Sequence, residues 1–156
     1  MTPALPPEQL ISALVPAAVP RPVPVPPPIP VLPVRRLPAD AGELPLLDMA
    51  RLDRSGRVSA CTLIHAIGWR SGTAIDIDVV DSALLVSAAP SGAHRLGSRG
   101  EVPLPAPVRT LCGIRPADRV VLAAYPALNL IAIHPVEVVA RLVYQLHNRS
   151  AADDGP

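Results

Sequence analysis

The chain has 156 residues and a formal net charge of +1, and 14 of its 22 prolines lie before residue 50. A charge so near neutral excludes a polycationic nucleic-acid coat protein and an acidic tail protein. Outside the proline-rich third, roughly a hundred residues remain for a core, which suits one compact domain and not two.

Residues 1–45 are predicted to be a disordered, proline-rich extension. The run from Pro22 to Pro33 favours polyproline II, because proline lacks the backbone N–H and restricts the residue before it. A solvated extension and a docking segment for a proline-binding protein are the two interpretations. Met49, where the patterned sequence begins, is an alternative start of the chain.

The cysteines and the apolar runs favour a cytoplasmic protein. Cys61 and Cys112 are the only cysteines and form no CxxC motif, so we expect two buried, reduced thiols and neither a disulfide scaffold nor a zinc site. The apolar stretch 9–20 lacks a basic segment before it, which argues against a signal peptide. The uncharged run 120–136 contains two prolines and is not expected to span a bilayer as a helix.

From residue 49 onward the sequence contains an internal repeat. Residues 50–58 align with 94–102 at an offset of 44, which superposes Arg51 on Arg95 and Gly56 on Gly100. After one inserted residue the offset becomes 45. We therefore predict two related units, 46–90 and 91–135.

Each unit is predicted to fold as ββαββ. A short strand, a glycine turn and a second strand precede a short helix, and two further strands close the unit. The predicted strands are 49–53 and 93–97, those around Val58 and Val102, 75–79, 84–87, 120–124 and 130–134; the predicted helices are 61–67 and 106–112. Gly68 and Gly113 are predicted to end the helices in the left-handed conformation.

The end of the chain is predicted to form an amphipathic helix over 136–148, followed by a disordered tail over 149–156. Pro135 is predicted at the first helical position, and Glu137 and Arg141 form a favourable i,i+4 pair. The helix has one apolar stripe, formed by Val139, Leu142, Val143 and Leu146. This stripe offers a contact for a homo-oligomer.

The segment from Arg99 to Leu122 resembles the AbrB/SpoVT/MazE-type swapped-hairpin domain. The family's signature combines a glycine turn, Leu-Pro, a helical Arg, Gly-Ile and Asp at fixed spacing. The matching residues are Gly100, Val102, Leu104, Pro105, Val108, Arg109, Gly113, Ile114 and Asp118. The first unit resembles the same domain through fewer residues, namely Gly56, Arg57, Val58, Gly68, Trp69 and Gly72.

The resemblance implies a fold and a function. In that family two ββαββ units interleave into one small barrel that usually binds DNA, so this chain is expected to be mainly β with short helices, a tandem pseudo-dimer in one polypeptide. It also implies a transcriptional regulator that contacts double-stranded DNA through basic side chains. The implied DNA-binding residues are Arg51, Arg57, Arg95, Arg99 and Arg109. The chain departs from the pattern at Glu101, which follows the second glycine, and at Ile64 and His65 in the first helix.

Other chemistry is not indicated by the sequence. Asp76 and Asp78 share a strand face but have no third ligand within reach, and the four histidines have no ligand or triad spacing. Trp69 is interpreted as a core residue. We expect no enzyme activity, no metal and no cofactor. The alternative functions are a protein-interaction or assembly module on a degenerate barrel of the same type, and an antitoxin.

Overall fold

The computed structural model describes residues 44–153, with side chains up to Arg149, and most of its elements are strands. In chain order the elements are β1 (Leu46–Arg51), β2 (Arg57–Ser59), α2 (Cys61–Ala66), β3 (Ala74–Val80), β4 (Ala83–Ala88), β5 (His94–Arg95), β6 (Glu101–Pro103), α3 (Ala106–Leu111), β7 (Arg119–Tyr125), the 3-10 helix η1 (Pro126–Leu128), β8 (Leu130–Pro135) and α4 (Val136–Asp153). The predicted extension up to residue 43 and the last three residues of the predicted tail lie outside the described residues.

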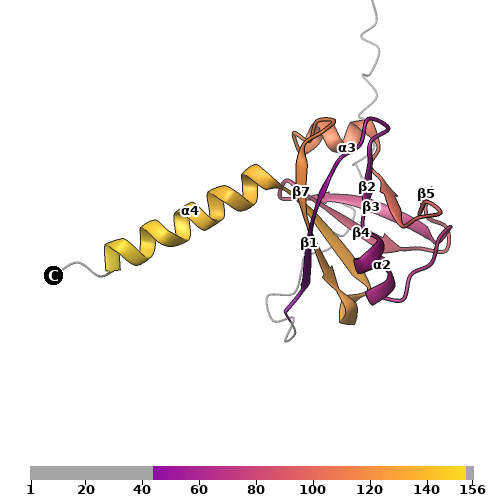
Figure 1. Ribbon diagram of the computed structural model, residues 1–156, viewed down its shortest axis with the longest axis horizontal. Coiled ribbons are helices and arrows are strands. Elements are labelled where there is room, and N and C mark those ends of the chain that lie inside the picture. Colours follow the sequence, from indigo (N-terminus) through magenta and orange to yellow (C-terminus); the bar gives the residue numbers. More distant parts are fainter. Residues whose placement is uncertain (1–43, 154–156) are drawn as a thin grey trace, which may run out of the picture. The chain divides into compact units, whose positions relative to one another are not determined.

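The described strands form two antiparallel sheets, and not the single closed barrel that the resemblance implies (Figure 1). The larger sheet has the order β1-β7-β8-β4-β3-β5, and the smaller one pairs β2 with β6. Within the described residues, the hairpins β3–β4 and β7–β8 join strands that are neighbours in sequence. The remaining pairs, β1–β7, β2–β6, β3–β5 and β4–β8, each join a strand before residue 90 to one after it. Each half of the chain therefore completes its sheets with strands of the other half.

Backbone hydrogen bonds recur between the halves at the spacing of the sequence repeat. The N–H of Ala60 donates to the carbonyl of Gly100 at 3.0 Å, and the N–H of Leu104 donates to the carbonyl of Gly56 at 2.8 Å. At an offset of 44 residues Ala60 corresponds to Leu104 and Gly56 corresponds to Gly100, so each bond is the counterpart of the other with the two halves exchanged. Both glycines have positive φ, as the predicted tight turns require.

The ends of the two short helices also correspond. Gly68 and Gly113 have φ of +77° and +68°, which confirms the predicted left-handed positions. Their N–H groups donate to the carbonyls of His65 and Thr110 at 3.0 and 3.1 Å. Each helix is one residue shorter than predicted, because the last predicted residue is its C-cap.

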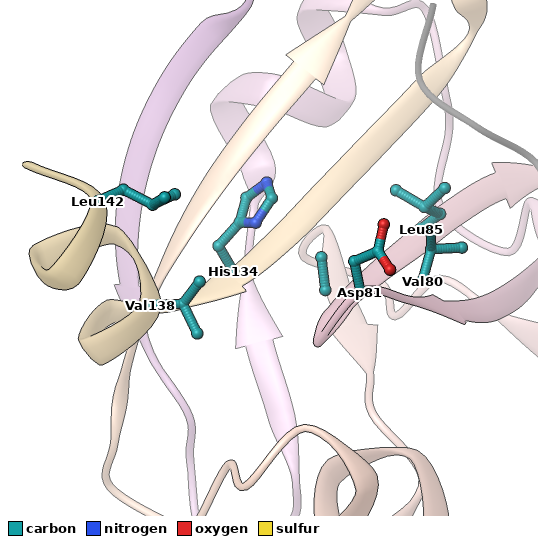
Figure 2. Close-up of a pocket in the computed structure, with 7 residues that line it drawn as sticks. Val80, Asp81, Leu85, His134, Val138 and Leu142 are labelled. Atoms are coloured by element: carbon teal, nitrogen blue, oxygen red, sulfur yellow. The ribbon is translucent and has the colours of Figure 1, made fainter. Parts of the chain in front are cut away.

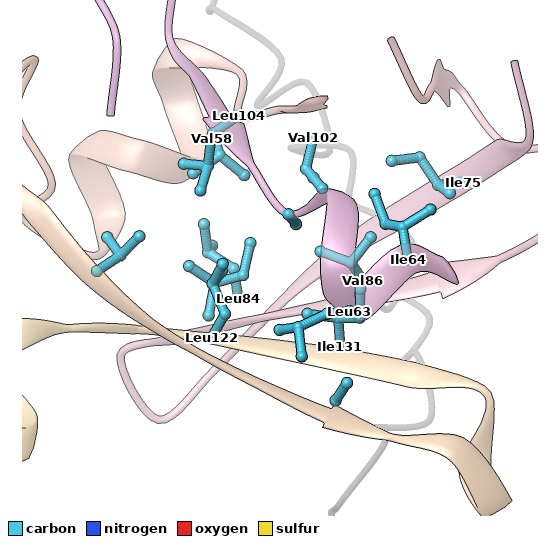
Figure 3. Close-up of a cluster of buried hydrophobic side chains, with 14 of the residues drawn as sticks. Val58, Leu63, Ile64, Ile75, Leu84, Val86, Val102, Leu104, Leu122 and Ile131 are labelled. Atoms are coloured by element: carbon cyan, nitrogen blue, oxygen red, sulfur yellow. The ribbon is translucent and has the colours of Figure 1, made fainter. Parts of the chain in front are cut away.

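One apolar cluster contains side chains from both halves (Figure 3). Val58 and Ile64 come from the first half, and Val102, Leu122 and Ile131 come from the second; all are at most 2% exposed. Trp69 belongs to this cluster, which agrees with its interpretation as a core residue. Cys112 is buried in it as predicted, whereas the predicted burial of Cys61 is wrong, because this residue lies on the exposed side of α2. A second, smaller buried cluster consists of Leu85, Ala123, Leu130 and Ala132.

Strand bounds differ from the predicted ones where long-range pairing decides them. β1 begins at Leu46, three residues earlier than predicted, because β7 supplies partners from Arg119 through Ala124. β5 has only two residues, His94 and Arg95, which pair with the start of β3. The local alternation of apolar and polar residues does not indicate which distant strand will pair with a segment, and so does not fix where the strand begins and ends.

Helix α4 begins at Val136 and contacts β7 and β8. Pro135 is the last residue of β8, so its predicted place at the first helical position is wrong: it still pairs with Val120 of β7. The helix continues to Asp153, beyond the predicted end at residue 148. Leu142 and Val143 of the predicted apolar stripe are 58% and 49% exposed.

None of the helices in the described residues combines the length and apolar character needed to cross a membrane.

Candidate nucleic-acid interface

Strands β1, β2, β6 and β5 adjoin one another and form one wall of the fold, called here the arginine wall. An isolated bridge between Leu52 and Val58 joins the end of β1 to β2, and β2 pairs with β6. The N–H of Gly97, just after β5, donates to the carbonyl of Glu101 in β6 at 2.8 Å. The wall is thus built from both halves of the chain.

Alternation along these strands turns arginines away from the core. The core side of the wall consists of Leu52, Val58, Leu96 and Val102, which are at most 3% exposed. Arg51, Arg57 and Arg95 each stand next in sequence to one of these residues, and all three are exposed. Because successive strand residues point to opposite faces, the three guanidinium groups belong to the outer face of the wall.

Two further arginines contribute to this surface. Arg99, in the turn between β5 and β6, has a side chain that is 90% exposed. Arg119 lies opposite Arg51 in the β1–β7 register, which places two exposed arginines on neighbouring strands. Sequence reasoning did not select Arg119, because only the pairing of β1 with the distant β7 brings it beside Arg51.

Hydrogen bonds orient parts of the wall. The Nη1 of Arg95 donates to the carbonyl of Gly72 at 3.1 Å, which fixes its guanidinium at the edge of β5. The backbone N–H of Arg57 donates to Oδ1 of Asp53 at 2.8 Å, and this bond steadies the turn before β2.

Glu101 places one negative charge within this basic surface. Its Oε2 accepts the N–H of Arg99 at 2.9 Å, and its Oε1 lies 3.4 Å from the Nε of Arg99. The bond from the Arg99 N–H holds the pKa of Glu101 below its ordinary value, and the charges of Arg99 and Arg57 act in the same direction. Glu101 therefore stabilises the β5–β6 turn while it weakens the positive field of the wall.

Arg109, the fifth predicted contact, is held within the fold. It is half-buried on α3, and its Nε donates to the carbonyl of Leu104 at 2.9 Å. Its guanidinium also lies against Gly56, where an added Cβ would be 3.2 Å from Cζ and Nη2. Four of the five predicted arginines are thus on the exposed surface, and Arg109 joins the second helix to the turn of the first half.

The remaining polar candidates have local partners. Oδ1 of Asp76 accepts the N–H of Ala93 at 3.1 Å, so this carboxylate holds the segment before β5, while Asp78 is exposed. The Nε1 of Trp69 donates to Oδ1 of Asn129. Among the described side chains, no three His, Cys, Asp or Glu residues come close enough together to hold a metal ion.

A groove of about 370 Å³ lies between the start of α4 and the β3–β4 turn (Figure 2). Its wall is mostly apolar and includes Val80, Leu85, Val138 and Leu142. Asp81 and His134 are the ionisable side chains that line it. Burial lowers the pKa of His134, so the neutral imidazole is favoured there. This apolar α4 groove differs in character from the charged arginine wall.

The chain was compared with protein-family models, curated proteins and solved structures, and it matches none of them.

Proposed function

We propose that residues 46–135 are two swapped-hairpin units of the AbrB/SpoVT/MazE type, interleaved within one chain, and that the protein binds double-stranded DNA as a regulator of transcription. The pairing of strands between the halves supports the first part of this proposal. The matching hydrogen bonds of Ala60 and Leu104 support it further, because they relate the halves by the offset of the sequence repeat.

The outer face of the arginine wall carries the functional proposal. Arg51 and Arg57 come from the first half and Arg95 and Arg99 from the second, and all four are exposed. Guanidinium groups on a strand surface can bind phosphates along the backbone and can donate paired hydrogen bonds to guanine edges. A net charge near +1 for the whole chain does not oppose this, because neutralisation of phosphates at the contact surface supplies the affinity.

The salt dependence of duplex binding tests this proposal. Fluorescence anisotropy with a labelled library of duplexes is expected to show affinity that falls steeply between about 50 and 200 mM salt, with a slope of roughly 0.9 for each phosphate contact. Arg57→Ala and Arg95→Ala are each expected to weaken binding and to lower the slope by about one if the side chain contacts a phosphate. Arg149→Ala removes the same charge from α4, outside the wall, and is the matched control with an unchanged slope.

Two results would contradict the proposal. One is absence of binding by the unmodified protein at low salt above that of a neutral control protein. The other is an equal loss of affinity in Arg149→Ala and in the two wall variants, because the wall would then have no special role.

A second candidate function, a protein-interaction or assembly module, is favoured by α4. Its residues Leu142, Val143 and Tyr144 are between 49% and 67% exposed, which is unusual for consecutive large apolar side chains. Pairing of this helix with a second copy of the chain is compatible with DNA binding by the wall.

A further inference from the structure

A second pocket, the α2 pocket, has a volume of about 300 Å³ and lies between α2 and the β5–β6 turn. Its buried lining consists of Ile64, Trp69 and Gly100. Its exposed rim consists of Cys61, His65, Arg70, Ser71, Ser98 and Arg99. None of these nine lining residues is an aspartate or a glutamate. The rim instead combines two guanidinium groups, an imidazole and two hydroxyls, which are the donors that bind oxyanions.

The rim donors are available to a ligand. Within the described residues, the guanidinium of Arg70 forms no ion pair. Arg99 pairs with Glu101, but its side chain is 90% exposed, and an ion pair of this kind contributes little to stability and is easily exchanged. The Nδ1 of His65 lies 2.8 Å from the carbonyl of Cys61, so Nδ1 donates that bond, and Nε2 donates to a phosphate only when the imidazole carries its second proton.

The corresponding place in the second half is closed by the protein itself. At the repeat offsets, Ile64 corresponds to Arg109 and Gly100 corresponds to Gly56. Arg109 lays its guanidinium against Gly56 and so fills the space between helix and turn. In the first half Ile64 is only 2% exposed and packs into the core, and Gly100 faces Cys61, whose Cα would lie 2.9 Å from an added Cβ. The halves thus differ beside the turn glycine: a guanidinium lies there in the second half, whereas in the first half the α2 pocket opens beside Cys61 and Gly100.

We propose that the α2 pocket binds a phosphate group, with Arg70 and Arg99 as its principal ligands and His65, Ser71 and Ser98 as further donors. Arg99 belongs both to the pocket rim and to the turn of the arginine wall, so the pocket continues the wall toward α2. A DNA phosphodiester and a free phosphate share the chemistry that this site recognises. That the bound phosphate belongs to DNA rests on the proposed function, whereas the presence of a phosphate site does not.

The thiol of Cys61 on the rim provides a direct readout. In a Cys112→Ala background Cys61 is the only cysteine of the chain, and its alkylation by the uncharged reagent N-ethylmaleimide can be followed by mass spectrometry. Inorganic phosphate at millimolar concentration, compared with chloride at equal ionic strength and pH, is expected to slow this reaction several-fold. A short DNA duplex is expected to do the same. Anisotropy in the same samples reports whether the duplex is bound.

Variants decide where the protection arises. Arg70→Gln is expected to abolish protection by phosphate, and Arg115→Gln, its counterpart at the repeat offset, is the matched control that retains it. Protection by phosphate without duplex binding would support the pocket and refute the DNA proposal. Duplex binding without protection of Cys61 by either probe would overturn the pocket while leaving the wall. Protection that survives Arg70→Gln would also overturn it.

Discussion

At the residue scale, Arg109 has a structural role that the sequence resemblance does not reveal. Its Nε bond to the Leu104 carbonyl fixes the side chain within the second half, and its guanidinium contacts Gly56 of the first half. Arg109→Ala is expected to lower the free energy of unfolding by about 1–3 kcal/mol, because a charged donor is lost from a half-buried carbonyl. Urea unfolding followed by circular dichroism measures this change.

Arg109→Lys separates geometry from charge. Lysine keeps the positive charge but lacks the planar fork that reaches the carbonyl and the turn glycine together, so it should recover only part of the stability. A fully stable Arg109→Ala variant with weaker, less salt-sensitive DNA binding would show instead that Arg109 is a DNA contact.

Glu101 stabilises its own turn and, under the proposed function, opposes DNA binding by its negative charge. Glu101→Gln should tighten duplex binding, since it removes a negative charge from beside Arg57 and Arg99. The folded protein lowers the pKa of Glu101, so this carboxylate stabilises the fold above its unfolded pKa near 4.5, and that contribution is lost as the pH falls through the lower folded value. Glu101→Gln should therefore also flatten the pH dependence of stability in the acid range, measured by thermal melts.

A second acidic residue, which lies outside the wall, provides the control for Glu101. Asp78→Asn removes a carboxylate from an exposed position on β3, outside the wall, and should leave the affinity for DNA unchanged. Weaker DNA binding by Glu101→Gln would contradict the electrostatic account of the wall.

Sequence reasoning identified individual residues where the local chain conformation determines their role. Gly68 and Gly113 have the predicted left-handed conformation because a short helix that ends in a tight turn requires it. The bond of Arg109 to Leu104 and the bond of Asp76 to Ala93 were not predicted. Both depend on which backbone atoms the fold brings within reach of a side chain, and no periodicity contains that information.

At the scale of the element, the proposed self-association rests on the exposed apolar side chains of α4. In an antiparallel pair of these helices, Leu142 and Val143 would meet at the centre. Leu142→Glu is expected to raise the dimer dissociation constant at least tenfold, since about 1.5–3 kcal/mol is lost for each buried leucine. Sedimentation velocity measures the dissociation constant.

The polar side of the same helix supplies the comparison. Asn148→Glu adds the same charge seven residues after Arg141, away from the apolar stripe, and should leave association unchanged. A monomeric unmodified protein at micromolar concentration, or equal effects of the two substitutions, would contradict pairing through α4.

Elements were predicted better than their ends. Strict alternation around Ile75 and Ile77 identified β3, whereas the start of β1 was misplaced because its partner β7 is distant in sequence. The apolar stripe of α4 was found, but an amphipathic pattern does not say what covers it. The exposure of Leu142 and Val143 came from the structure alone.

At the scale of the whole molecule, neither half can complete its sheets alone. β1 and β3 take their partners β7 and β5 from the second half, and β2 and β4 pair with β6 and β8. A separate half would expose the apolar faces of these strands to water. Fragments 44–90 and 91–153 are therefore expected to be unfolded individually and to fold on mixing, as seen by circular dichroism.

The arginine wall shares this dependence on both halves, since Arg51 and Arg57 belong to one fragment and Arg95 and Arg99 to the other. Duplex binding by each fragment alone, by their equimolar mixture and by the full chain is the most direct single measurement of the account. The mixture is expected to bind with the affinity and salt slope of the full chain, and neither fragment alone should do so. Equal binding by one fragment alone, or no binding by the full chain at low salt, would contradict a DNA-binding wall assembled from the two halves.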